Sequence, residues 1–111
     1  MKINQRDIIN VDFLFPNGKT KNYYAIVVSN NELIEAEGFV YLALITSKDY
    51  QSEYYFELSD DMILNFKFPR KSYVKCHILM VTIDNILSQR VGSMKKAPFE
   101  QIRNRIIESI F

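Results

Sequence analysis

The sequence predicts a mainly β fold, a small barrel or strongly bent antiparallel sheet of five or six short strands followed by one C-terminal helix. Short runs of β-branched and aromatic residues alternate with turn residues along most of the chain. From Pro98 onward the apolar spacing changes to that of a helix. A closed or strongly bent sheet is expected because closure leaves few strand edges exposed.

The first half of the chain predicts two strands and one short helical turn. Apolar and polar residues alternate over residues 9–13, which is typical of a half-buried strand, and residues 16–18 (PNG) form a turn. Residues 23–29 are almost all β-branched or aromatic and predict a central strand that is buried on both faces. Asn31 to Glu37 fit one short helical turn, which Gly38 ends.

The second half of the chain predicts further strands. Residues 39–45 form one strand, and residues 53–58 form another that edges the sheet. Residues 72–76 and 77–83 are expected to form one long strand or two bent ones, and residues 84–87 a short turn.

Residues 59–71 lie between turn signals and contain the breaker Pro69, so this segment is expected to be a loop. Ile63 and Leu64 are its expected buried anchors. After it, the sequence predicts one amphipathic C-terminal helix with Pro98 at the first helical position. The apolar stripe of this helix comprises Phe99, Ile102, Ile106 and Ile110, and Ile107 widens it.

Length and charge limit the classes of function. The chain has 111 residues, of which 48% are apolar, and we expect one domain over residues 1–111. Fourteen basic and thirteen acidic residues give a formal net charge of +1. No global field therefore attracts nucleic acid or an anionic membrane, and a charged partner must meet a local patch.

Cysteine and histidine usage argues against metal or disulfide chemistry. Cys76 is the single cysteine, and with one histidine the chain cannot supply a four-ligand structural zinc site. His77 directly follows Cys76, and neighbours on a strand point to opposite faces. We expect Cys76 to be a small buried residue rather than a nucleophile, and we expect no cofactor and no metal.

No apolar run reaches the length of a membrane span, and the first ten residues lack a long apolar stretch. We therefore expect a soluble cytoplasmic protein with no membrane partner.

Cations and aromatic residues are concentrated in two segments at the ends of predicted strands. These are residues 19–24 (KTKNYY) and 46–50 (TSKDY). Lysines neutralise phosphate, hydroxyls bond its oxygens and tyrosine rings stack on unpaired bases, so the pattern favours binding of single-stranded RNA. The same residues also fit solvated turns and a tyrosine-rich core.

Four short segments in this order resemble the MazF/PemK family of toxins from type II toxin–antitoxin systems. They are residues 6–13 (RDIINVDF), 25–30 (AIVVSN), 45–47 (ITS) and 71–76 (KSYVKC), and the closing helix follows them as in the family. The resemblance implies an SH3-like barrel, usually a homodimer. It also implies an endoribonuclease that a cognate antitoxin neutralises by covering the RNA groove.

The resemblance implies metal-independent cleavage of single-stranded RNA to 2′,3′-cyclic phosphate and 5′-hydroxyl ends. Thr46 matches the threonine of the family's Thr-Ser segment. Where the family has Arg-Pro-Ala, this chain has Tyr23, Tyr24 and Ala25, so the expected guanidinium is absent from that position. Lys21 lies on the same side of an extended strand as Tyr23 and brings an ammonium group instead.

The sequence thus yields two sets of candidate site residues. The first set is catalytic and comprises Thr46, Lys21 and Tyr23, whose phenol serves as an acid or a stacking surface. The second set binds RNA and comprises Lys19, Ser47, Lys48, Lys75 and His77. His77 stands where the family commonly has an acidic residue, and it serves as a proton shuttle if it faces the groove.

Three functions remain open at this level. The first is an endoribonuclease toxin. The second is a MazF-like module with weak or no catalysis, which binds RNA, DNA or a protein partner. The third is a dimerising domain in which the aromatic residues are core.

Overall fold

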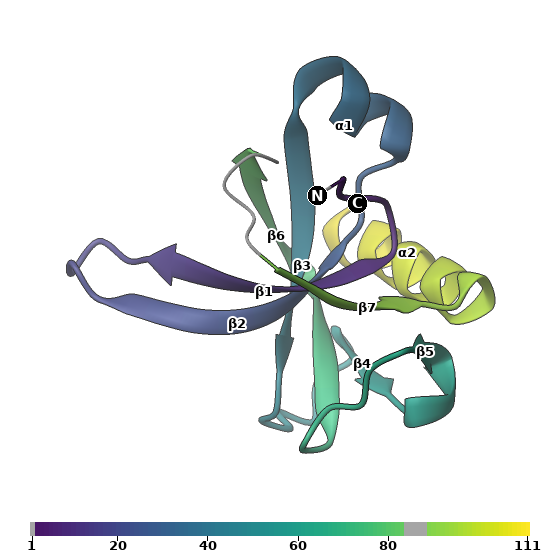
Figure 1. Ribbon diagram of the computed structural model, residues 1–111. Helices are drawn as coiled ribbons and strands as arrows, with labels where there is room; N and C mark the ends of the chain where they lie inside the picture. Colours follow the sequence, from purple (N-terminus) through teal and green to yellow (C-terminus); the bar gives the residue numbers. More distant parts are fainter. Residues whose placement is uncertain (1, 84–88) are drawn as a thin grey trace.

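The computed structural model of the protein describes residues 2–83 and 89–111. A curled antiparallel sheet forms a half-barrel, and the C-terminal helix packs against it (Figure 1). The strand order is β4-β6-β3-β2-β1-β7-β5. The strands are β1 (Asp7–Leu14), β2 (Thr20–Val27), β3 (Phe39–Thr46), β4 (Tyr55–Leu58), β5 (Ile63–Leu64), β6 (Ser72–Ile83) and β7 (Gln89–Met94). The predicted fold class is confirmed, although the described residues contain seven strands rather than five or six.

Two hydrophobic clusters lie on the two faces of the sheet, and β2 contributes to both. Ile26 is fully buried in the cluster that includes α2 (Lys96–Ile110). Ala25 and Val27, also fully buried, belong to the opposite cluster with Ile34 of α1. The prediction of a strand buried on both faces is therefore confirmed.

The β1–β2 hairpin projects from the body of the molecule (Figure 1). Its turn is closed by a hydrogen bond from the Phe15 N–H to the Lys19 carbonyl at 2.9 Å. Gly18 adopts a φ of 83°, which favours glycine. β2 begins at Thr20, earlier than the predicted residue 23, because residues 20–24 continue the pairing with β1.

Helix α1 (Asn31–Glu37) has the predicted bounds. The Asn30 side chain accepts a hydrogen bond from the Leu33 N–H at 2.8 Å and so caps the N-terminus. Gly38 ends the helix in the left-handed region, with a φ of 72°.

Strand β6 is one long strand of 12 residues. Its pairing with β3 shifts register between Ala43 and Ile45, which bends the sheet. β4 lies at the predicted edge, where the Arg105 guanidinium of α2 donates to the carbonyls of Glu53 and Tyr55 at 3.0 and 3.3 Å. The predicted turn at 84–87 lies outside the described residues.

The segment before β6 differs from the predicted loop. It contains a 3₁₀ turn (Asp60–Met62) and the short strand β5, which pairs with β7. Ile63 is buried, as predicted, but Leu64 is 45% exposed because consecutive strand residues face opposite sides. The sequence does not predict β7, because its residues QRVGSM lack apolar alternation. This segment is a strand because it pairs with β1 on one side and β5 on the other.

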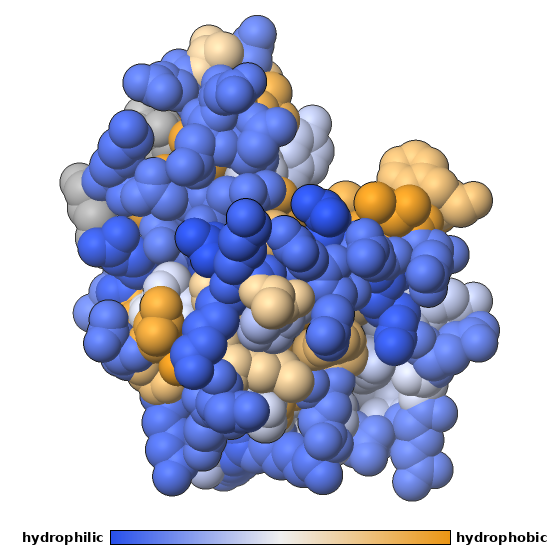
Figure 2. Space-filling model, turned by 90° about the vertical axis from the view of Figure 1, so that its right-hand side faces the viewer, coloured by the Kyte–Doolittle hydropathy of each residue, from blue (hydrophilic) through white to orange (hydrophobic). Residues whose placement is uncertain are grey.

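Helix α2 buries Phe99, Ile102 and Ile106, as the stripe predicts. Ile110 and Ile107 are instead 40% and 50% exposed, so the stripe is not buried over the last turn. Pro98 is the third helical residue rather than the first, which is tolerated because the first four N–H groups have no partner within a helix. Seen from the side of α2, the surface is largely hydrophilic, with one protruding apolar group at the upper right and smaller apolar patches elsewhere (Figure 2). None of the helices in the described chain has the length and apolar character of a membrane span.

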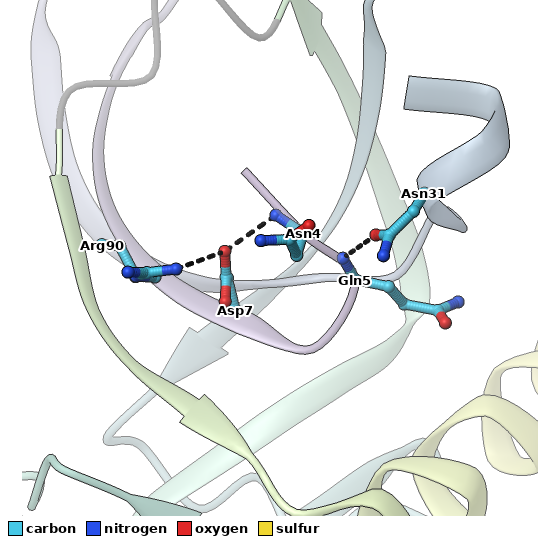
Figure 3. Close-up of polar contacts among 5 residues, drawn as sticks. All are labelled: Asn4, Gln5, Asp7, Asn31 and Arg90. Atoms are coloured by element: carbon cyan, nitrogen blue, oxygen red, sulfur yellow. Dashed lines mark hydrogen bonds and ion pairs between the residues drawn. The ribbon is translucent and has the colours of Figure 1, made fainter. Parts of the chain in front are cut away.

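Polar contacts hold the N-terminal segment against the sheet and α1 (Figure 3). The Asn4 N–H donates to the Asp7 carboxylate at 2.8 Å, and the Gln5 N–H donates to the Asn31 side chain at 2.7 Å. Arg90 of β7 lies 3.7 Å from the same carboxylate. Burial raises the pKa of Asp7, although the Asn4 hydrogen bond and Arg90 act against this rise.

The stripe of α2 yields a matched test of stability. Ile102→Ala removes a fully buried side chain and is expected to lower the free energy of unfolding by about 2–5 kcal/mol. Ile107→Ala removes the same atoms from a site that is half exposed, and should change stability by less than about 0.5 kcal/mol. Urea unfolding followed by circular dichroism measures the stability of both variants. Equal losses of unfolding free energy would contradict the burial of Ile102 and the exposure of Ile107.

Candidate nucleic-acid interface

A groove of about 430 Å³ opens beside the end of β3, between the first half of β2 and the segment that leads into β6. We call it the Thr46 groove. It brings together six of the eight predicted site residues, from three separate parts of the chain. These residues are Lys21, Tyr23, Thr46, Ser47, Lys48 and Lys75.

Strand register explains why these side chains meet. Tyr24 pairs with Ile45, so the next positions in the antiparallel register place Tyr23 beside Thr46. Lys21 lies two residues before Tyr23 and shares its face of β2. The hydroxyl, the phenol and the ammonium group therefore line the same groove.

The Thr46 side chain is half-buried and oriented by the loop that follows it. Its Oγ1 accepts a hydrogen bond from the Lys48 N–H at 3.2 Å. A hydroxyl that accepts from the backbone keeps its own proton for donation. The hydroxyl proton of Thr46 is therefore not used in this hydrogen bond.

Aromatic rings lie beside two of the lysines. The Lys21 Nζ lies 5.3 Å from the centre of the Tyr23 ring, and the Lys75 Nζ lies 5.9 Å from that of Tyr50. These distances fit cation–π attraction, which favours positions over the ring faces. Tyr50 is 53% exposed and forms an aromatic surface at the border of the groove.

Lys19 and His77 are not among the residues that line the Thr46 groove. Lys19 is exposed in the β1–β2 turn, where its N–H donates to the Asn17 side chain at 3.0 Å. The ring of His77 lies 5.2 Å from that of Tyr54 and stacks on that of Tyr55 at 5.6 Å, measured between ring centres. Within the described residues its buried Nδ1 has no hydrogen-bond partner. RNA binding by Lys19 and His77 stays a prediction.

Sequence reasoning missed the contribution of the segment between β5 and β6. Phe68, Pro69 and Arg70 line the Thr46 groove, although they lie more than twenty residues from Thr46 in the chain. The segment was predicted as a loop, and single-sequence patterns do not show where a loop folds. The basic pair of Arg70 and Lys71 was the available signal.

Comparison with known proteins places the chain in a family. Residues 4–110 match the family model described as PemK-like, MazF-like toxin of type II toxin-antitoxin system. This protein is a PemK/MazF-like toxin. Comparison of its sequence with curated proteins gives no match.

Solved structures share the fold of this MazF-like toxin. A MazE–MazF complex from Deinococcus radiodurans aligns with a TM-score of 0.77 at 10% identity, over 96% of this chain and 93% of that chain. A mycobacterial endoribonuclease in complex with its cognate antitoxin gives 0.75 at 13% identity, over 97% and 94%. The toxin MazF-mt6 from Mycobacterium tuberculosis gives 0.69 at 16% identity, over 95% and 92%.

The chemistry of Cys76 in this MazF-like toxin agrees with the sequence prediction of a buried residue. Cys76 is fully buried, and this burial raises the pKa of its thiol to about 11, although Arg105 acts in the opposite direction. A protonated thiol is a poor nucleophile and a poor metal ligand. Within residues 2–83 and 89–111, no group of three or more His, Cys, Asp or Glu side chains is arranged to hold a metal ion.

The raised pKa predicts the reactivity of Cys76. In native buffer at pH 8 the thiol stays protonated and buried, so an aromatic disulfide reagent should not label it. Addition of urea should expose one reactive thiol for each chain, which the absorbance of the released thiolate measures. Rapid labelling of the folded protein would contradict the buried assignment.

Proposed function

We propose that this MazF-like toxin is an endoribonuclease that cleaves single-stranded RNA in the Thr46 groove without a metal ion. The supporting observation is the convergence of the Thr46 hydroxyl with cations from β2, the β3–β4 loop and β6. With a net charge of only +1, attraction of RNA depends on a local concentration of cations such as this one. The family membership and the endoribonucleases among the structural neighbours support the same conclusion.

The proposed reaction is transfer of the RNA phosphate within the substrate. The ribose 2′-oxygen attacks the adjacent phosphorus, its proton passes to water, and the bond to the 5′-oxygen breaks. The products are a 2′,3′-cyclic phosphate and a 5′-hydroxyl. Thr46 donates a hydrogen bond to a non-bridging oxygen, Lys21 offsets its developing charge, and the Tyr23 phenol protonates the departing 5′-oxygen.

RNA binding rests on the groove and its aromatic border. Ser47, Lys48 and Lys75 contact the phosphates, and the exposed ring of Tyr50 stacks on an unpaired base. Lys19 extends the basic surface along the β1–β2 turn, where phosphates beyond the groove reach it. His77 contributes through its stack with Tyr54 and Tyr55 rather than as a proton shuttle.

The proposed inhibitor of the toxin is a cognate antitoxin. Structural neighbours include complexes between toxins and antitoxins, such as the MazE–MazF complex. An acidic or amphipathic segment of the antitoxin would occupy the surface formed by Lys19, Lys21, Lys48 and Lys75 and exclude RNA by competition.

We further propose that two copies of the chain associate through the far end of the β3–β6 pair. Phe39 pairs with Ile83 and Tyr41 pairs with Val81 in the sheet. Phe39, Val81 and Ile83 are 45%, 54% and 49% exposed, which forms an apolar patch on neighbouring strands. A twofold arrangement allows the same patch on both copies to cover itself.

One observation favours a second function, that of a weakly active or inactive binding module. Tyr23 occupies the position of the family's arginine, and a phenol does not carry the charge of a guanidinium. A module of this kind binds RNA, DNA or a protein in the same groove without cleaving RNA.

Cleavage of a mixed single-stranded RNA in the presence of a chelator distinguishes the two functions. We expect the wild type to release fragments with cyclic phosphate ends, and Thr46→Ala to cleave about 10²–10³-fold more slowly because it loses a hydrogen bond to the charged oxygen. Thr46→Ser keeps the hydroxyl and should retain most activity. Thr82→Ala, which lies outside the groove, serves as a control. RNA binding without any cleavage by the wild type would favour the binding module.

The apolar patch yields a test of the oligomeric state. Val81→Glu places a charge in the proposed interface and should convert dimers to monomers, because burial of an unpaired charge is costly. Leu64→Glu changes a leucine that is 45% exposed on β5, away from the patch, and should leave the mass unchanged. Light scattering after size exclusion measures both. A monomeric wild type would reject this interface.

A further inference from the structure

The segment between β5 and β6 carries three cations, and two of them are neutralised by acidic neighbours. The Lys67 Nζ lies 3.6 Å from the Asp60 carboxylate, and the Lys71 Nζ lies 3.0 Å from that of Glu57. Among the described residues, Arg70 has no ion pair, and it lines both the Thr46 groove and a neighbouring pocket that Glu57 and Asp60 also line. Because Glu57 and Asp60 are paired with Lys71 and Lys67, Arg70 is the cation of this segment that has no ion pair.

Contacts on both sides hold the backbone that carries Arg70. Phe68 is buried, and its ring lies 5.2 Å from that of Tyr24 and 4.9 Å from that of Phe66. On the other side, the Ser72 hydroxyl donates to the Arg70 carbonyl at 2.9 Å. Arg70 thus lies on a segment that is fixed to β2 and to the start of β6.

The chemistry of the groove needs a group of this type. Charge develops on two non-bridging oxygens of the scissile phosphate as the 2′-oxygen attacks. Lysine presents a compact point charge, whereas a guanidinium donates two parallel hydrogen bonds to two such oxygens. Among the groove-lining residues in the described chain, Arg70 alone carries a guanidinium.

We propose that Arg70 is a catalytic residue that binds the non-bridging oxygens of the scissile phosphate together with Thr46. This assignment rests on the proposed endoribonuclease function. Tyr24 is part of the Tyr23–Tyr24 pair that departs from the family's pattern, and its ring packs on Phe68 of the segment that carries Arg70. In this assignment the guanidinium comes from the segment before β6, whereas the family's pattern has it on β2.

The test compares single-turnover cleavage with binding of an RNA that has a 2′-deoxyribose at the cleavage site. Arg70→Gln should slow cleavage by about 10²–10³-fold, while affinity for the uncleavable RNA stays near that of the wild type. Arg70→Lys should recover only a small part of the rate, because it restores charge without the two parallel donors. Lys67→Gln removes a paired cation of the same segment and should cleave as the wild type does.

Chemical rescue adds a readout that a structural role would not change. Millimolar guanidinium should raise the cleavage rate of Arg70→Ala and leave that of Thr46→Ala unchanged. Normal cleavage by Arg70→Gln beside an inactive Thr46→Ala would overturn the role of Arg70 and leave the nuclease function standing. Equal losses of binding and cleavage would also overturn it, and a wild type that does not cleave would overturn both. Thermal unfolding checks that each variant is folded. If Arg70→Gln does not fold, Arg70→Lys is compared with the wild type in its place.

Discussion

The structure depends on the burial of β2 on both faces of the sheet. Ala25, Ile26 and Val27 are completely buried, so a hydrophobic layer must cover each side of the strand. The C-terminal helix supplies one layer, and the N-terminal segment with α1 supplies the other. The sheet curls around these layers, which brings distant strands close enough to build a common site.

The Thr46 groove lies where this double burial ends. The first half of β2 extends beyond the two clusters, and the side chains there change from apolar to polar and cationic. Thr46 is the last residue of β3, and the rings of Phe68 and Tyr24, which both line the groove, are in contact. The contact between Phe68 and Tyr24 therefore contributes to the shape of the groove, while Lys21 and Arg70, only a few residues away, contribute its charge.

Local sequence determined most of the elements. Alternation and β-branched runs predicted β1, β2 and β3, and Gly38 predicted the end of α1, because these signals act between near neighbours in the chain. β5 and β7 escaped prediction, because they are strands only through pairing with each other and, for β7, with β1. The burial of Ile63 beside an exposed Leu64 followed from the same pairing.

The sequence by itself also indicated the family, and six of the candidate site residues that it named line the Thr46 groove, because the strand ends that carry them have recognisable patterns. Only the tertiary structure decided that Arg70 lies in the groove and that His77 lies outside it among tyrosine rings. The path of the segment before β6 depends on the contact between Phe68 and Tyr24, which are far apart in the chain. Such a contact forms only when the sheet has curled. The spacing of residues in the sequence therefore does not predict it.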